Sequence, residues 1–239
     1  MKGTSGLLFE RYNTYTRRPT VQDPRLRRVI FKSFARVLGP WLPSNTDSRI
    51  LDIACGEGAL LSFLQDRGYG NLDGFDISPE SVTLCHGLGL DFVRRFDAQH
   101  LEDWPDPHMY DVVFALDILE HIPKQDAANF LGSIRARLLP GGYTVIQTPN
   151  MGSIFGTYHR FNDLSHEYAL TEKSALDLLM VAGFEARAVE IRPAWNATTT
   201  LGYLREGYLR LLHRAIYLAE DSSRPKIPTK NLLIRATRT

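Results

Sequence analysis

The chain has 239 residues, enough for one well-buried α/β domain, and no glycine- or serine-rich linker or internal repeat suggests a second domain. A formal charge of +1 gives no overall sign of nucleic-acid binding, and no charged-then-apolar leader or bilayer-length apolar run is visible, so a cytoplasmic protein without a transmembrane segment is expected. Cys55 and Cys85 are too few for a disulfide framework and fall in predicted core elements, which fits a reducing compartment.

Residues 1–45 are predicted to form a helical arm that covers the main fold. Its apolar residues recur at roughly helical spacing up to Gly39-Pro40, and they are Val29, Ile30, Phe34, Val37 and Leu38. The arm is also locally basic, through Arg17, Arg18, Arg25, Arg27 and Arg28. These arginines could meet an anionic substrate, but a solvated helix face is the preferred interpretation.

An apolar run over residues 51–54 breaks into a glycine turn at Gly56 and Gly58. Glycine at these positions allows backbone N–H groups to approach a ligand. Residues 59–64 follow at helical spacing, which points the positive end of a helix at that ligand and suits a carboxylate or phosphate. Taken alone, the turn is equally compatible with an ordinary strand-to-helix connection.

A second strand over residues 72–76 ends in Asp76, where doubly wound folds place the acid that accepts hydrogen bonds from ribose hydroxyls. Ser78-Pro79 then predicts a helix cap, with a helix to about His86. Further strands are expected at 91–95, 110–115, 143–147, 185–191 and 231–236, and helices at 127–139 and 171–182, with Thr171 as a cap. Because strands and helices alternate, the sheet should be parallel with right-handed crossovers.

Five segments, taken in order, resemble the motifs of class I S-adenosylmethionine-dependent methyltransferases. They are Asp52-Ile-Ala-Cys-Gly-Glu-Gly58, Gly74-Phe-Asp-Ile-Ser78, Phe96-Asp-Ala98, Tyr110–Leu116 and Leu138-Leu-Pro-Gly-Gly142. One departure is Ala54, where many members carry glycine. Leu61 replaces the third glycine of the dinucleotide fingerprint, which counts against a nicotinamide dehydrogenase.

The resemblance implies an α/β, Rossmann-like fold with a seven-stranded, mostly parallel sheet and an antiparallel last strand. It implies S-adenosylmethionine as cofactor and S-adenosylhomocysteine as product. The cofactor-binding residues that it implies are Asp52, Ala54, Gly56, Gly58, Asp76, Ile77, Asp97, Ala98 and Leu116.

A first catalytic candidate is the segment Asp117-Ile-Leu-Glu-His121, just past the fourth strand. It resembles the Glu-x-x-Glu-His segment of ubiquinone-pathway O-methyltransferases, in which carboxylates and histidine lie near the substrate. A divalent ion there would be a hard one such as Mg²⁺. Because Asp117 is shorter than glutamate, we assign no metal ligand, and His121 is equally well explained as packed beneath the cofactor.

A second candidate is the stretch His159–Tyr168, interpreted as a polar loop without periodicity. Its Asp163-x-x-His166 pattern resembles methyltransferases of surface-polysaccharide and small-molecule biosynthesis. Histidine can remove a hydroxyl proton near neutral pH, and Asp163 or Glu167 could fix its tautomer. We favour His166 as the base, followed by His121 and Asp117; the alternative is that His166 only bonds the loop backbone.

Residues 193–228 are expected to be a helical insertion before the last strand, with an amphipathic helix. Its apolar positions are Leu201, Leu204, Tyr208, Leu211, Leu212 and Ile216. Packing on the parent domain or on a second subunit is preferred over membrane contact, so a monomer or homodimer is expected.

The leading hypothesis is O-methylation of a sugar, nucleotide sugar or surface glycan with a histidine base. The alternatives are a ubiquinone-type phenol O-methyltransferase, an N-methyltransferase and a non-catalytic S-adenosylmethionine-binding partner protein.

Overall fold

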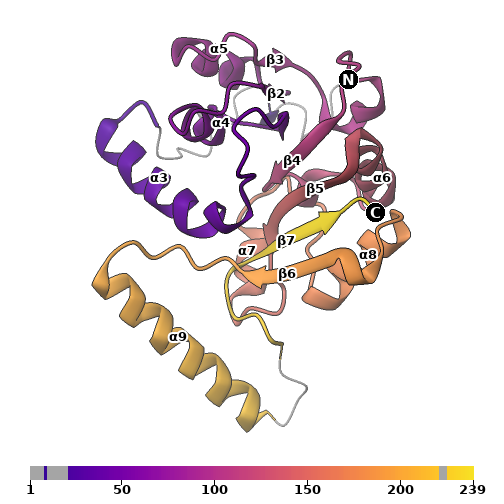
Figure 1. Cartoon of the computed structure of the whole chain (residues 1–239). Coiled ribbons are helices and arrows are strands. Elements are labelled where there is room, and N and C mark those ends of the chain that lie inside the picture. The colour runs from indigo at the N-terminus through magenta and orange to yellow at the C-terminus, as the bar shows by residue number, and fades with distance from the viewer. Residues whose placement is uncertain (1–7, 10–20, 221–224) are drawn as a thin grey trace.

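A computed structural model describes residues 8–9, 21–220 and 225–239 of the chain (Figure 1). These residues contain one seven-stranded sheet in the order β3-β2-β1-β4-β5-β7-β6. Strand β7 runs antiparallel to both of its neighbours, and the other pairs are parallel, which confirms the expected fold class. The strands are β1 (Ile50–Ile53), β2 (Leu72–Asp76), β3 (Arg94–Arg95), β4 (Tyr110–Leu116), β5 (Leu138–Pro149), β6 (Val189–Pro193) and β7 (Asn231–Thr237).

Helices cover both faces of this sheet. On one face lie α3 (Pro24–Val37), α4 (Ala59–Gln65) and α5 (Pro79–Gly87), which pack on one apolar cluster. On the other face lie α6 (Ala127–Arg137) and α8 (Glu172–Val181), which pack on a second cluster. The central strands β1 and β4 contribute side chains to both clusters, which explains why most of their residues are apolar on both sides.

Several short elements connect these layers. They are η1 (Gly39–Trp41), η2 (Ala98–Asp103), η3 (Leu119–His121), α7 (Gly156–Phe161) and η4 (Ala186–Ala188). The two predicted helix caps are confirmed: the Ser78 side chain accepts from the Ser81 N–H, and Thr171 forms a capping box with Ser174.

Three strand boundaries predicted from the sequence are wrong. The strand expected at residues 143–147 spans Leu138–Pro149, because Leu138 already pairs with Tyr110 of β4 before an irregularity in the register, and the helix expected to reach residue 139 ends at Arg137. The strand expected at residues 91–95 is limited to Arg94 and Arg95, because the chain before it turns back with the Val93 N–H donating to the Leu90 carbonyl. The strand expected at residues 185–191 is displaced to Val189–Pro193, because residues 186–188 form a 3₁₀ turn. Strands β3 and β6 lie at the sheet edges, where pairing on one side leaves the boundary weakly specified.

Of the predicted N-terminal arm, helix α3 is described, and Arg17 and Arg18 lie outside the described residues. Arg27 forms an exposed ion pair with Asp66 at 2.9 Å. The prediction that both cysteines lie in core elements is right for Cys85 and wrong for Cys55. Cys85 is fully buried in α5, whereas Cys55 is half-buried in the turn after β1.

The predicted insertion contains helix α9 (Thr200–Ala219), which extends away from the sheet in Figure 1. Of the two preferred partners for its apolar face, the parent domain is wrong, and a second subunit stays a prediction. Its buried residues are Glu206 and His213, while Leu204 and Leu211 are exposed. Arg36 of α3 donates to both oxygens of the Glu206 carboxylate, from Nη1 at 2.9 Å and from Nη2 at 2.6 Å. This ion pair holds the polar face of α9 toward the domain. None of the helices in the described ranges has the length and apolar character needed to cross a bilayer.

Candidate active site

The predicted glycine turn follows β1 and adopts an unusual backbone. Ala54, Gly56 and Gly58 have φ values of 54°, 56° and 77°, in the left-handed region. A Cβ on Gly58 would lie 2.5 Å from Leu90 Cδ1, so this position requires glycine for space as well as conformation. A Cβ on Gly56 would meet nothing within 4 Å, so Gly56 borders open space. The turn therefore presents backbone to a space that a ligand can enter.

Asp76, at the end of β2, fastens this turn to the sheet. Its Oδ2 accepts from the Gly56 N–H at 2.9 Å, and its Oδ1 accepts from the Ser78 N–H at 2.8 Å. Burial raises the pKa of Asp76, and the two N–H donors oppose that shift. A carboxylate oxygen has two lone pairs, so Asp76 can hold the turn and still accept from a ligand hydroxyl.

Asp52 lies on the neighbouring strand and is also buried. Burial, and then repulsion from Asp76, raise the pKa of Asp52 well above its ordinary value. Two neighbouring buried carboxylates make a site that favours a positively charged ligand, because such a ligand would stabilise their ionised forms.

The other residues of the predicted cofactor set follow the adjacent strands. Ile77 follows β2, Asp97 and Ala98 follow β3, and Leu116 ends β4. Because β3, β2, β1 and β4 are consecutive and parallel, these positions meet at one edge of the sheet. Ala98 is buried, and the Asp97 carboxylate caps η2 by accepting from the Gln99 N–H at 3.0 Å. The structure thus gathers this predicted set along one edge.

The first catalytic candidate, residues 117–121, begins just beyond β4. Asp117 and the pair Glu120 and His121 have different surroundings. Asp117 has a φ of 55°, a strained conformation for a residue other than glycine. Its carboxylate accepts from Gln147 Nε2 at 3.0 and 3.1 Å and from Asn231 Nδ2 at 3.4 Å. Asp117 is therefore held against β5 and β7.

Glu120 and His121 lie in η3 and are both buried. Thr148 Oγ1 donates to Glu120 Oε2 at 3.0 Å. The ring of Phe9 meets the His121 ring edge-on, with centroids 5.8 Å apart. Glu120 belongs to the segment that the sequence singled out, whereas Thr148 and Phe9 gave no signal that would have placed them here.

A hydrogen-bonded chain orients His121. Ser165 Oγ lies 2.5 Å from Asp163 Oδ1 and 3.0 Å from His121 Nδ1. Since the hydroxyl has one proton and a carboxylate can only accept, Ser165 donates to Asp163 and accepts from His121 Nδ1–H. Nδ1 of His121 therefore carries the proton, and Nε2 is the basic nitrogen of the neutral ring. The sequence suggested Asp163 as an orienting acid, but for His166, and it did not identify Ser165.

His166 lies against His121, with ring centroids 4.8 Å apart in an edge-to-face arrangement. Burial lowers the pKa of His166, while Asp163 and the backbone carbonyls of Arg160 and His159 partly offset the shift. The ring is thus neutral near pH 7 and able to accept a proton. The interpretation of residues 159–168 as a loop is wrong in part, because residues 159–161 belong to α7.

One potential cation-binding group lies in this part of the described structure. One ligand atom from each of Glu120, His121 and His166 lies within 4.8 Å of the others, and Asp117 is outside this group. Two imidazoles and one carboxylate suit Zn²⁺, Mn²⁺ or Fe²⁺ better than the Mg²⁺ expected from a carboxylate pair. The group could therefore act as a proton acceptor or as a ligand set.

Comparison with known proteins gives three kinds of match. The family model of a methyltransferase domain matches residues 23–189. The ubiquinone biosynthesis O-methyltransferase of Aeromonas salmonicida is 35% identical over 108 residues, which cover 43% of this chain and 43% of that protein. The corresponding protein of Marinobacter nauticus is 31% identical over 156 residues, 58% of this chain and 64% of that protein. The matched region thus spans less than two thirds of these curated relatives.

Solved structures share the fold. A methyltransferase from Archaeoglobus fulgidus, described as dependent on S-adenosylmethionine, has a TM-score of 0.67 at 22% identity, covering 95% of this chain and 97% of that one. Magnesium protoporphyrin IX methyltransferase from Synechocystis, with bound S-adenosylhomocysteine, has a TM-score of 0.63 at 16% identity and covers 97% of each chain.

Proposed function

Because the chain belongs to the class I S-adenosylmethionine-dependent methyltransferases, we propose that it transfers a methyl group from this cofactor to an acceptor hydroxyl. The observation that carries the proposal is the glycine turn fastened by Asp76 at the same sheet edge as the pair His121 and His166. The first group suits the cofactor, and the second suits removal of a hydroxyl proton.

The residues around the turn fit S-adenosylmethionine. Its sulfonium and ammonium groups are positive, which matches the buried carboxylates Asp52 and Asp76. The open space beside Gly56 admits the ligand to the backbone, and the remaining lone pairs of Asp76 can accept from ribose hydroxyls. The resemblance assigns Asp97 to the adenine side. When bound, the cofactor supplies a methyl group on an already activated leaving group.

The protein must then align the acceptor oxygen and remove its proton. We assign proton removal to His166, whose half-buried ring is neutral near pH 7. His121 stands beside it and is held in one orientation by Ser165 and Asp163. In the alternative description, Glu120 and the two histidines hold a divalent cation, which would lower the pKa of the acceptor hydroxyl.

A phenol of the ubiquinone-precursor type is the acceptor that we place first. The curated relatives act in ubiquinone biosynthesis by name, and the Phe9 ring beside His121 offers a flat apolar surface on which an aromatic acceptor can pack. The sugar or glycan acceptor favoured from the sequence remains a second candidate, supported by the Asp163-x-x-His166 resemblance.

Labelled S-adenosylmethionine offered with catechols, quinols and nucleotide sugars tests the proposal. We expect a methylated catechol or quinol, and a chelator will leave the rate unchanged if His166 acts as a simple base. Loss of activity with chelator and recovery with Zn²⁺ or Mn²⁺ would favour the cation description. Cofactor binding without any methylated product would favour a non-catalytic role.

A further inference from the structure

Helix α9 presents its apolar side to solvent. Leu201, Leu204, Tyr208, Leu211, Ile216 and Leu218 have exposed fractions between 40% and 81%. At 100° per residue these positions cover an arc of about 160° on the helix. That arc is wider than the narrow seam with which two helices pair in a coiled coil, so a broad surface such as a lipid interface can cover more of it than a single partner helix can.

The opposite side of α9 fixes the helix to the domain by polar contacts. Glu206 accepts from Arg36 and from the Ala197 N–H at 2.7 Å, and Arg210 stacks on the Trp195 ring at 4.6 Å. Tyr217 donates to the Gly152 carbonyl at 3.2 Å. The helix is therefore attached at both ends with its apolar arc outward, so the exposure of that arc follows from specific contacts.

The charges beside the apolar arc are positive. Arg205 and Arg214 are exposed at its margins. Glu206 is the only carboxylate within α9, and it is buried and paired with Arg36. In two copies of the helix packed face to face, α9 would offer no free acid to pair with these arginines. An anionic phospholipid surface supplies that negative charge, and each arginine near it strengthens binding about fivefold.

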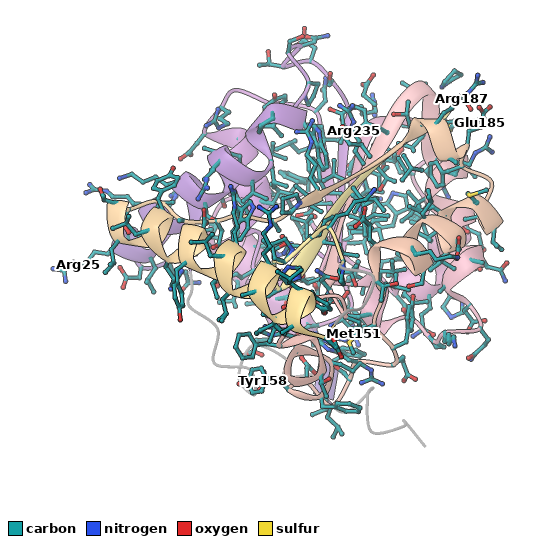
Figure 2. All side chains as sticks on the ribbon, turned by 90° about the horizontal axis from the view of Figure 1, so that it is seen from below. Arg25, Met151, Tyr158, Glu185, Arg187 and Arg235 are labelled. Carbon is teal, nitrogen blue, oxygen red and sulfur yellow. The ribbon has the colours of Figure 1, made fainter. Side chains whose placement is uncertain are left out.

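The position of α9 relates this surface to the active site. Strand β6 runs parallel to β5, because both are antiparallel to β7, so α9 leaves the sheet at the edge that carries the glycine turn and the histidines. Helix α7 and the residues that flank it expose Phe155, Tyr158, Phe161 and Leu164. Tyr217 near the C-terminal end of α9 contacts Gly152, four residues before α7 begins, and Figure 2, seen from below, shows Met151 and Tyr158 near this end in projection.

We propose that the outward face of α9 docks the protein on an anionic phospholipid bilayer, with the exposed residues of α7 extending the contact. Leucines of the arc enter the interface, tyrosines lie at headgroup level, and Arg205 and Arg214 contact lipid phosphates. The active-site edge then faces the membrane, where an amphiphilic acceptor can reach the histidines. The docking surface does not depend on which acceptor is methylated, or on catalysis.

Co-sedimentation of the full chain with vesicles tests this surface. We expect binding to phosphatidylcholine vesicles containing phosphatidylglycerol, weaker binding to phosphatidylcholine alone, and release by salt. The double variant L204D/L211D should lower the partition coefficient by at least about tenfold per leucine. The double variant R205E/R214E should lower it at least about fivefold per arginine.

Matched controls lie elsewhere on the surface. Val181 of α8 is 76% exposed, and Arg187 forms only an exposed pair with Glu185, so V181D and R187E should bind vesicles like the unchanged protein. Binding of S-adenosylhomocysteine should be equal in all variants, which reports intact folding. The proposal is wrong if the unchanged protein ignores anionic vesicles or if L204D/L211D still binds them. A dimer in light scattering that L204D/L211D converts to monomer would assign the face to a second copy instead.

Discussion

Replacing Asp76 by asparagine tests how the cofactor turn is held. The carboxylate accepts one N–H with each oxygen, from Gly56 across the turn and from Ser78 two residues along. Asparagine keeps one acceptor oxygen and replaces the other by an NH₂ group, which can only donate. The Ser78 bond is local and should survive, so the Gly56 bond is the one expected to be lost.

The magnitude follows from that single bond. A hydrogen bond to a charged acceptor contributes about 1.5–3 kcal/mol, and cofactor binding must supply up to this energy to order the turn when the bond is absent. Asp76→Asn should therefore weaken cofactor binding about tenfold or more, up to about 150-fold. Asp76→Ala removes both bonds and the ribose acceptor, and it should weaken binding further. Asp73→Asn is the control, because Asp73 lies on the same strand but three residues earlier, and therefore points to the opposite face of the sheet.

Isothermal titration of S-adenosylhomocysteine into the three variants gives the affinities directly. We expect Asp73→Asn to bind like the unchanged protein. If Asp76→Asn also binds within about twofold of the unchanged protein, the turn does not need this bond to receive the cofactor. The reasoning that links the fastened turn to binding would then be wrong.

Three further substitutions probe the base, the turn and the buried acids. His166→Ala should lower kcat by about 10²- to 10⁴-fold in a methyl-transfer assay, with cofactor affinity retained. His121→Ala serves as the comparison. Full activity of His166→Ala would exclude His166 as the base. Gly58→Ala should lower the free energy of unfolding by at least about 1–2 kcal/mol in urea titrations, because it adds a Cβ at a positive φ and 2.5 Å from Leu90 Cδ1. An unchanged urea midpoint of unfolding would contradict this prediction. Burial and Asp76 raise the pKa of Asp52, so stability from its neutral form is present at low pH and is lost as pH rises through the folded-state pKa. The asparagine of Asp52→Asn is neutral at every pH, so this variant should be more stable than the unchanged cofactor-free protein by about 1–3 kcal/mol at pH 7 and no more stable near pH 3. The opposite pH trend would refute the raised pKa of Asp52.

Local sequence was enough to predict that the glycine turn and Asp76 lie at one edge of the sheet. The turn at Gly56 and Gly58 follows β1 and Asp76 ends β2, and parallel strands bring such positions together. The fold class followed from the same alternation of strands and helices. Edge strands were predicted less well, because pairing on one side constrains their ends weakly.

The contacts within the catalytic group could not be predicted in this way. Ser165 meets His121 across 44 residues, and Thr148 meets Glu120 across 28, so neither pair leaves a periodic pattern in the sequence. The helical periodicity of α9 was visible, but periodicity does not say which face a domain covers. That choice depends on Arg36, which lies 170 residues before Glu206 in the chain.

Transfer of a labelled methyl group is the most direct test of the central claim. The unchanged protein, S-adenosylmethionine carrying a labelled methyl group and a panel of catechol, quinol and nucleotide-sugar acceptors are incubated together and analysed by mass spectrometry. We predict one labelled methyl group on an acceptor oxygen, with an equal amount of S-adenosylhomocysteine released. Failure to bind S-adenosylmethionine, combined with tight binding of NADH, would contradict the account.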